Sequence, residues 1–223
     1  MEIMTKPEPK FIAQQLRKPS GEFAKRIGKK MNSINETLYD FVIDEMKLND
    51  HEKILEIGFG TGKFFNKLFS KANNLRVNGI DYSGEMVESA KELNQSAISL
   101  GKLNIKLGNS DNIDFEENSF DKVFCNNVIY FWKEPYRHLK EIYRVLKPGG
   151  KFYSGLRTRK SSLNFPFTKY GFVLYEPEDW ESILKQNGFS FINAKQMVET
   201  LIEEDGQSIK LESICCIAEK NNI

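Results

Sequence analysis

The stretch LEIGFGTGKF, from Leu55 to Phe64, decides the fold of this chain. Glycines at Gly58, Gly60 and Gly62 alternate with other residues directly after an apolar run, and a helix-like pattern follows them. Because glycine lacks a Cβ atom and tolerates positive φ, a backbone this bare lets a ligand lie against it. Amide groups at the start of the following helix favour an anion. The stretch therefore indicates a strand-to-helix turn that binds a ligand.

The rest of the chain alternates strand-like and helix-like segments, which predicts an α/β fold with a mostly parallel sheet covered by helices on both faces. The expected strands are 53–58, 76–81, 104–109, 121–126, 151–156, 189–197 and 209–219. The expected helices between them are about 61–71, 83–101, 135–146 and 177–188. No helix separates the last two strands, and their link contains Asp-Gly, so the final strand is expected to be antiparallel. The prediction is a doubly wound, seven-stranded sheet with a hairpin at one edge.

Residues 1–32 precede the first strand and are basic, with eight Lys or Arg against three Glu, a net charge of +5 in a chain of net charge +1. A turn signal at Lys18–Gly21 interrupts short helical pieces, and Ser33 with Glu36 forms a capping box that predicts a new helix to about Leu48. We therefore expect a basic helical arm, 1–32, before a ligand-binding domain, 33–223. The arm suits phosphate, nucleic acid or an anionic membrane surface, or it is a solvated helical face.

Cysteine and histidine are scarce. Cys125, Cys215 and Cys216 lie in apolar, strand-like runs without zinc-site spacing, and the two histidines do not cluster, so no metal site is expected. The first ten residues lack the apolar core of a signal peptide, and no run reaches the roughly 18 apolar residues that a membrane-spanning helix needs. The expected location is the cytoplasm.

Asp81, at the end of the predicted second strand, limits the kinds of ligand that the turn is expected to bind. Asp81 follows the glycines by about twenty residues, where a carboxylate suits the ribose diol of a nucleoside. The dinucleotide fingerprint G-x-G-x-x-G, counted from Gly58, requires a glycine where this chain has Lys63. The pattern E-x-G-x-G-x-G, from Glu56 to Gly62, instead favours S-adenosylmethionine, which has no pyrophosphate for the loop to hold. A nicotinamide-dependent oxidoreductase remains the alternative on the same sheet.

Four segments resemble, in order and spacing, the class I S-adenosylmethionine-dependent methyltransferases. They are LEIGFGTG (55–62), GIDYSGEMVESA (79–90), LGNSDNIDFEENSFDKVFCNNVIYFW (107–132) and EIYRVLKPGGKFY (141–153). The resemblance covers about Leu48 to Gly188. It implies the strand order 3-2-1-4-5-7-6 with strand 7 antiparallel, which agrees with the hairpin, and it implies S-adenosylmethionine as the cofactor and S-adenosylhomocysteine as its product.

The same resemblance implies roles for individual residues. The implied cofactor-binding residues are Glu56, Gly58, Gly60 and Gly62 at the methionyl end, Asp81 at the ribose, Tyr82 beside the adenine, Asn109, Ser110 and Asp111 at the adenine edge, and Asn126 and Asn127 near the methyl-transfer site. Asn109 stands where the family usually has Asp, and its amide oxygen can still accept a hydrogen bond from the adenine amino group. Without the resemblance, the same residues also suit a tight turn, a helix cap and ordinary turn positions.

Two groups of aromatic residues suggest what kind of molecule accepts the methyl group. The segment after the fifth strand contains Phe165, Phe167, Tyr170, Phe172 and Tyr175, and a second group is Tyr130–Trp132. They predict a small apolar or aromatic acceptor, although packing in the core would explain many of them equally well. No catalytic residue stands out: His138 is expected on a helix surface, and Glu134 and Tyr130 lie nearer the transfer site.

Nucleic acid is not the expected acceptor. The fourth strand ends in Asn-Asn-Val-Ile-Tyr, without the prolines of the D/N-P-P-Y/F/W motif that amino-methylating DNA enzymes usually carry. An RNA methyltransferase that uses the basic arm and a non-catalytic binding module remain as further alternatives. From its position before the first strand, the arm is expected to fold over the cofactor as a lid. The sequence leaves the oligomeric state open.

Overall fold

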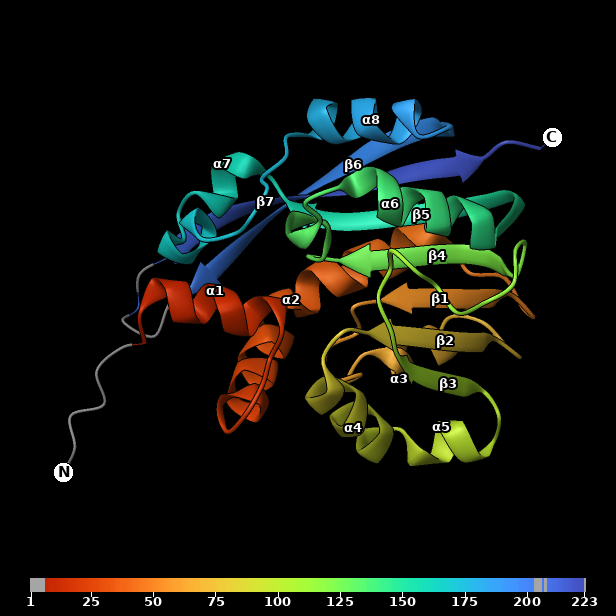
Figure 1. Ribbon diagram of the computed structural model, residues 1–223, viewed down its shortest axis with the longest axis horizontal. Helices are drawn as coiled ribbons and strands as arrows, with labels where there is room; N and C mark the ends of the chain where they lie inside the picture. Colours follow the sequence, from red (N-terminus) through yellow and green to blue (C-terminus); the bar gives the residue numbers. More distant parts are fainter. Residues whose placement is uncertain (1–6, 203–205, 207, 223) are drawn as a thin grey trace.

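One seven-stranded sheet organises the chain. The computed structural model describes residues 7–202, 206 and 208–222. The strand order is β3-β2-β1-β4-β5-β7-β6, and β7 runs antiparallel to both of its neighbours while the other pairings are parallel (Figure 1). The strands are β1 (Lys53–Ile57), β2 (Arg76–Asp81), β3 (Leu103–Leu107), β4 (Phe120–Asn126), β5 (Leu146–Arg157), β6 (Phe189–Ile202) and β7 (Ser208–Lys220). The predicted strand order and antiparallel seventh strand are confirmed.

Helices cover both faces of the sheet. They are α1 (Pro9–Arg17), α2 (Phe23–Met46), α3 (Phe65–Phe69), α4 (Gly84–Leu93), α5 (Gln95–Ser99), α6 (Pro135–Val145), α7 (Arg159–Ser162) and α8 (Pro177–Gln186), with 3-10 turns η1 (Ile129–Phe131) and η2 (Pro166–Lys169). One core cluster packs α6 and α8 against the sheet, for example through Leu139 and Trp180. The other packs α2, α3 and α4 through side chains such as Val42, Leu68 and Val87.

The helix predicted to begin at Ser33 begins ten residues earlier, because α2 runs without a break from Phe23 to Met46. The Ser-x-x-Glu pattern is not used as a cap: Glu36 instead forms ion pairs with Lys63 and Lys67 at 3.3 and 3.1 Å. The turn predicted at Lys18–Gly21 is confirmed between α1 and α2. Tertiary packing of α2 therefore overrides a local capping signal, and the boundary expected at residue 32 falls inside a helix.

The predicted helix 83–101 is two helices, α4 and α5, which meet at Asn94. The Asn94 side chain donates hydrogen bonds to the carbonyl oxygens of Ala90 at 2.8 Å and Gly62 at 3.0 Å. A side-chain donor that bonds the last carbonyls ends a helix, and here it also ties α4 to the glycine loop. The predicted cap is confirmed, since Ser83 Oγ accepts a hydrogen bond from the Met86 amide at 3.4 Å.

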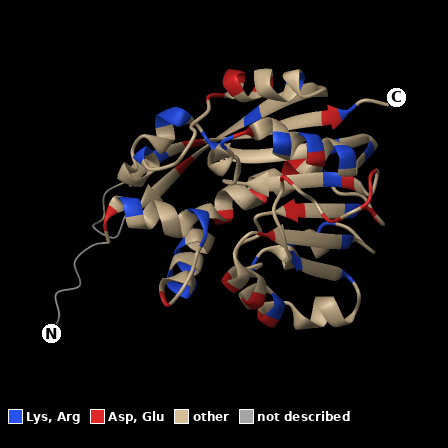
Figure 2. Cartoon of the chain, in the orientation of Figure 1, with Lys and Arg blue, Asp and Glu red and all other residues tan. Residues whose placement is uncertain are grey.

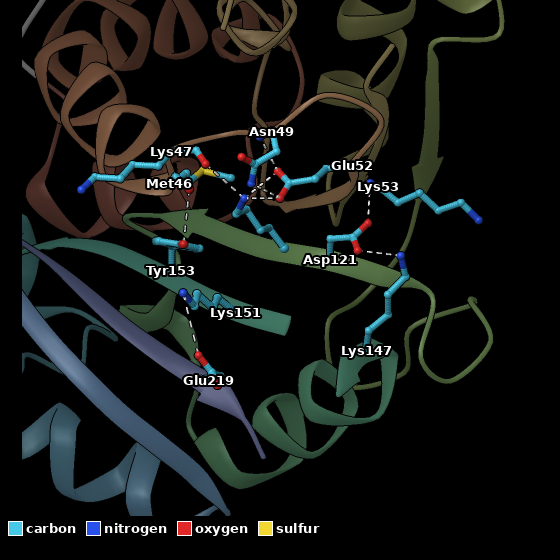
Figure 3. A network of polar contacts seen from close by, with 11 residues as sticks. Met46, Lys47, Asn49, Glu52, Lys53, Asp121, Lys147, Lys151, Tyr153 and Glu219 are labelled. Atoms are coloured by element: carbon cyan, nitrogen blue, oxygen red, sulfur yellow. Dashed lines mark hydrogen bonds and ion pairs between the residues drawn. The ribbon is translucent and has the colours of Figure 1, made fainter. Parts of the chain in front are cut away.

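The amino ends of β1 and β4 are held by buried charges at the edge of the sheet away from the glycine loop (Figure 3). Lys122 donates to Glu52 Oε2 at 2.6 Å and to the Lys47 carbonyl at 3.3 Å, which fixes the end of α2 to the sheet. Asp121 accepts a hydrogen bond from the Lys53 amide at 2.8 Å. Among residues 7–202, 206 and 208–222, no helix is long and apolar enough to span a membrane.

Candidate active site

The glycine loop leaves β1 at the carboxyl edge of the sheet, where ligands of doubly wound folds bind. Gly58, Gly60 and Gly62 have φ values of 74°, 58° and 69°, which residues with a Cβ atom rarely adopt. A Cβ placed on Gly60 would meet no other atom within 4 Å, so bare backbone faces open space there. Gly62 differs: a Cβ at this position would press against Ala90 and Asn94 of the neighbouring helix.

A cavity of about 300 Å³ lies against this loop and against the ends of β2 and β4. Ten of the eleven predicted cofactor-binding residues line it: Glu56, Gly58, Gly60, Asp81, Tyr82, Asn109, Ser110, Asp111, Asn126 and Asn127. Gly62 does not line the cavity, because it is used for close packing between the loop and α4. We call this space the first cavity.

Asp81 links β2 to the glycine loop. Its carboxylate accepts hydrogen bonds from the amides of Gly60 and Ser83, both at 2.9 Å. Burial raises the pKa of Asp81 to about 6, and these amide hydrogen bonds oppose that rise. A carboxylate has about four acceptor positions, so Asp81 keeps acceptor capacity for a hydroxyl group of a ligand.

Glu56 lines the first cavity and is buried, and the family resemblance implies a place for it at the methionyl group. Its carboxyl accepts a hydrogen bond of 2.6 Å from the Tyr39 hydroxyl of α2. Burial raises the pKa of Glu56 to about 8, although this hydrogen bond lowers it. Tyr39 is not among the predicted site residues; the available signal was a tyrosine on the apolar face of a helix, which needs a partner for its hydroxyl.

Two asparagines lie at the carboxyl end of β4: Asn126 is its last residue and Asn127 follows it. Both side-chain amide atoms of Asn126 are buried and lack a hydrogen-bond partner within the described part of the chain. Asn127 adopts φ 55° and donates to Asn35 Oδ1 of α2 at 3.0 Å. Buried polar groups are normally hydrogen-bonded, so the Asn126 amide suits a polar ligand group in the first cavity.

His138 also lines the first cavity. Its Nδ1 is 2.8 Å from Ser110 Oγ, and its ring stacks on Trp132 with centroids 4.6 Å apart and planes within 7°. Burial lowers the pKa of His138 to about 4, so the ring is neutral near pH 7. The expected surface position of His138 is therefore wrong: the turn η1 before α6 brings Trp132 over its ring, which helical periodicity does not reveal.

The arm contributes to the lining of the first cavity. Arg17, Pro19, Met31 and Asn32 are among its lining residues. The Ser83 hydroxyl donates to the Pro19 carbonyl at 2.6 Å, and the Thr61 hydroxyl donates to Asn32 Oδ1 at 2.9 Å. The Lys18 ammonium lies 4.4 Å from the centre of the Tyr82 ring. Contacts from the arm thus reach the glycine loop and the residues that follow β2.

A second cavity of about 330 Å³ adjoins the first, and the two share Leu16, Met31, Asn35, Asn127 and Phe131 as lining residues. Its aromatic lining comprises Phe11, Phe23, Tyr130, Phe131, Phe165, Phe167 and Phe172. Of the predicted aromatic group, Tyr170 is instead largely exposed, Tyr175 is buried in the core and Trp132 lines the first cavity. The second cavity is thus predominantly apolar and aromatic.

Of the two candidate proton acceptors, Tyr130 is already hydrogen-bonded and Glu134 does not line the second cavity. Tyr130 donates to the Arg157 carbonyl at 3.0 Å and accepts from the Arg157 amide. Burial raises the pKa of Tyr130, which keeps the phenol neutral. Glu134 lines the first cavity and is not among the lining residues of the second. Tyr130 therefore shapes the second cavity as a fixed, neutral wall.

Comparison with known proteins agrees with this geometry. Residues 55–154 match the methyltransferase domain family. The chain is 32% identical over 112 residues to a ubiquinone/menaquinone biosynthesis C-methyltransferase from Geotalea daltonii, a match that covers 50% of this chain and 48% of that protein. The chain thus matches about half the length of this relative.

Solved structures share the fold. A SAM-dependent methyltransferase from Methanosarcina mazei is 28% identical, with a TM-score of 0.59 over 80% of this chain and 97% of that chain. A methyltransferase solved in complex with the Haloferax volcanii Trm112 activator superimposes with a TM-score of 0.77 at 18% identity, over 89% and 94% of the two chains. The domain match, the sequence relatives and the solved structures together support a class I S-adenosylmethionine-dependent methyltransferase.

The lining of the first cavity fits the cofactor that this family implies. Gly60 offers bare backbone, the buried Asn126 amide has unused hydrogen-bonding capacity, and Asp81 retains free acceptor positions. Glu56 provides a carboxyl group for a cation in the cavity. These groups match in kind an adenosine, a ribose diol and a cationic amino-acid tail.

Proposed function

We propose that this protein transfers a methyl group from S-adenosylmethionine to a small apolar or aromatic acceptor. One observation carries the proposal: the polar first cavity and the aromatic second cavity meet at shared lining residues, among them Asn127 and Phe131. The family match favours methyl transfer over the nicotinamide alternative. A donor in one cavity and an acceptor in the other would meet at this junction.

In this proposal the first cavity holds the cofactor, which supplies an activated methyl group on a sulfonium. Asp81 binds the ribose hydroxyls, and Glu56 faces the methionyl ammonium. The Asn126 amide takes the methionyl carboxylate, while Ser110 and Asp111 lie at the adenine edge. Each assignment rests on the side chain's place in the cavity lining and on its hydrogen-bonding capacity.

The chain's own contribution is to position the acceptor and exclude water. Good orientation of two reactants can supply roughly 7–11 kcal/mol of the barrier. The aromatic walls at Phe131 and Phe172, whose ring centroids are 4.8 Å apart, suit a flat apolar acceptor. The quinone C-methyltransferase relative makes a hydroquinone one acceptor to test.

We further propose that the arm acts as a lid over both cavities. Leu16 and Met31 line both, and the Pro19 carbonyl is held by Ser83 beside the proposed ribose site. For a bound nucleoside to leave, this contact would have to open. Deletion of residues 1–20 should therefore weaken cofactor binding; unchanged binding and turnover in a folded deletion variant would exclude a lid.

Calorimetric titration with S-adenosylhomocysteine, with NAD in parallel, tests the cofactor assignment. We expect micromolar binding of S-adenosylhomocysteine, about 100-fold weaker in Asp81→Asn because charge-assisted hydrogen bonds are lost. Asp114→Asn is the matched control, since Asp114 is exposed and pairs with Lys106 away from the cavity. Binding of NAD alone would contradict the assignment, and binding without transfer to any acceptor in a broad panel would indicate a binding module.

A further inference from the structure

The cations of the arm gather at one end of the molecule. Described residues 7–32 contain seven Lys or Arg against two Glu, a net charge of +5. The basic residues are Lys10, Arg17, Lys18, Lys25, Arg26, Lys29 and Lys30. Apart from Lys18, in the turn after α1, they lie on α1 and on the amino-terminal part of α2, and Figure 2 shows the Lys and Arg of this region at the same end of the molecule as α7. This end therefore carries a local positive charge that the whole chain does not.

Three of these seven cations, all lysines, form no ion pair within the described part of the chain. Lys10, Lys25 and Lys29 are exposed, and the ion pairs formed between described residues do not include them. Lysines elsewhere behave differently: Lys67 and Lys71, for example, pair with Asp40 and Asp44 of α2 at 2.6 and 2.7 Å. The charge of Lys10, Lys25 and Lys29 is thus available to a partner.

Large apolar side chains are exposed among these cations. Phe23, which lines the second cavity, is 37% exposed, and Arg26 lies 5.9 Å from the centre of its ring. Leu163, directly after α7, is 62% exposed, and Tyr170, directly after η2, is 45% exposed. Because η2 packs against α1, these groups lie on the same end as the arm. We call the surface formed by Lys10, Lys25, Lys29, Phe23, Leu163 and Tyr170 the basic rim.

We infer that the basic rim docks on an anionic phospholipid surface and that the second cavity takes its acceptor from that membrane. Basic residues are attracted to anionic headgroups, and exposed aromatic and aliphatic side chains between them enter the interface. Phe23 and Arg26 belong to the lining of the second cavity, so the cavity reaches the rim. The inference rests on the proposed function, since it assigns the source of the same apolar acceptor.

The exposed apolar groups favour lipid over RNA as the partner. Phosphate contacts alone would need only the lysines, whereas Leu163 offers an aliphatic side chain, which cannot stack on a base. The adjoining cavity is lined by phenylalanines, which suits a lipid-soluble acceptor better than a polar nucleotide. The experiment below also tests RNA binding, as the alternative to lipid binding.

Co-sedimentation of the full chain with vesicles tests the inference. We expect binding to vesicles of phosphatidylcholine mixed with phosphatidylglycerol, weak binding to phosphatidylcholine alone, and loss of binding at high salt. Lys10→Gln/Lys25→Gln/Lys29→Gln should lower the partition coefficient on the order of 100-fold, at roughly fivefold per lysine. Leu163→Gln should lower it with the charge unchanged.

The matched control is Lys91→Gln/Lys102→Gln/Lys140→Gln, which removes the same charge from exposed positions on α4, before β3 and on α6. It should retain binding. Equal losses in the two triple variants, or no binding to anionic vesicles by the unaltered chain, would overturn the inference. So would binding of poly(U) that anionic vesicles fail to displace, which would assign the rim to RNA.

S-adenosylhomocysteine binding, measured on the same samples, separates this inference from the proposed function. If the unaltered chain binds S-adenosylhomocysteine but not vesicles, only the membrane inference is contradicted. If the unaltered chain does not bind S-adenosylhomocysteine, the proposed function itself is contradicted. In the rim variant, unchanged cofactor binding and melting temperature show that the fold is intact.

Discussion

The Tyr39 hydroxyl donates a hydrogen bond of 2.6 Å to Glu56 Oε2, and this contact joins α2 to the end of β1, just before the glycine loop. Both groups are buried, and both line the first cavity. Burial raises the pKa of Glu56 to about 8, so the carboxyl is mostly protonated at pH 7 without a ligand. A cationic ligand group beside it would favour the ionised form.

The first prediction concerns stability against pH. In the folded chain Glu56 keeps its proton up to about pH 8, whereas in the unfolded chain it ionises near its ordinary pKa of 4.5. The folded state therefore binds more protons between these values, and the free energy of unfolding should fall as pH rises through this window. Between pH 6.5 and 8 we expect a fall of about 1–2 kcal/mol.

Urea denaturation at several pH values checks this slope, and Glu56→Gln should flatten it above pH 6.5. Asp81 acts in the same direction at lower pH, because burial raises its pKa to about 6. If the slope persists unchanged in Glu56→Gln, the pH dependence of the free energy of unfolding comes from another group. Glu85→Gln, an exposed position near the same cavity, is the control.

The second prediction links cofactor binding to proton release. If the methionyl ammonium lies beside Glu56, binding near pH 7 should ionise this carboxyl and release up to one proton. Calorimetry in buffers of different ionisation enthalpy measures that number. Glu56→Gln should remove the release and weaken binding about 100-fold. Tyr39→Phe should keep the release, because the carboxyl remains.

The third prediction concerns Gly28, where α2 crosses the glycine loop. A Cβ at this position would lie 2.6 Å from Thr61 Cγ2, closer than such atoms approach. Alanine is otherwise the better helix former by about 1 kcal/mol. We expect Gly28→Ala to displace the loop and weaken S-adenosylhomocysteine binding about tenfold. Calorimetry would contradict this expectation if affinity were unchanged.

The fourth prediction separates the two cavities. Phe172 lines the second cavity and does not line the first, and its ring centroid is 5.9 Å from that of Tyr130. Phe172→Ala should raise KM for an aromatic acceptor about tenfold and leave S-adenosylhomocysteine affinity within twofold, since it removes only acceptor contacts. Equal losses of both affinities would mean that the cavities do not act separately.

The fifth prediction concerns the ion pair between Lys122 and Glu52, at the edge of the sheet away from the glycine loop. Lys122 and Glu52 are 8% and 15% exposed, and loss of the lysine would leave a carboxylate unpaired there. Lys122→Met should lower the free energy of unfolding by about 3 kcal/mol. Lys71→Met breaks an exposed pair with Asp44 and should cost below about 1 kcal/mol. Urea denaturation of both variants at pH 7 compares them.

The glycine pattern and strand spacing were sufficient to predict the sheet, because period and turn chemistry are local properties of the chain. The same patterns failed at Ser33, whose capping signal lies inside α2. They also do not reveal that Gly62 packs against α4 and is absent from the cavity lining. Burial decided both cases, and a local signal does not encode burial by distant segments.

By itself, the sequence determined the α/β sheet and its antiparallel seventh strand, and its resemblance to known methyltransferases pointed to ten residues that line the first cavity. Motif residues follow the ends of parallel strands, and a parallel sheet brings those ends to one edge. Only the tertiary structure decided that Tyr39 meets Glu56, that Trp132 covers His138 and that a second, aromatic cavity lies beside the first. Those contacts join segments far apart in the chain, and they depend on how helices pack across the sheet.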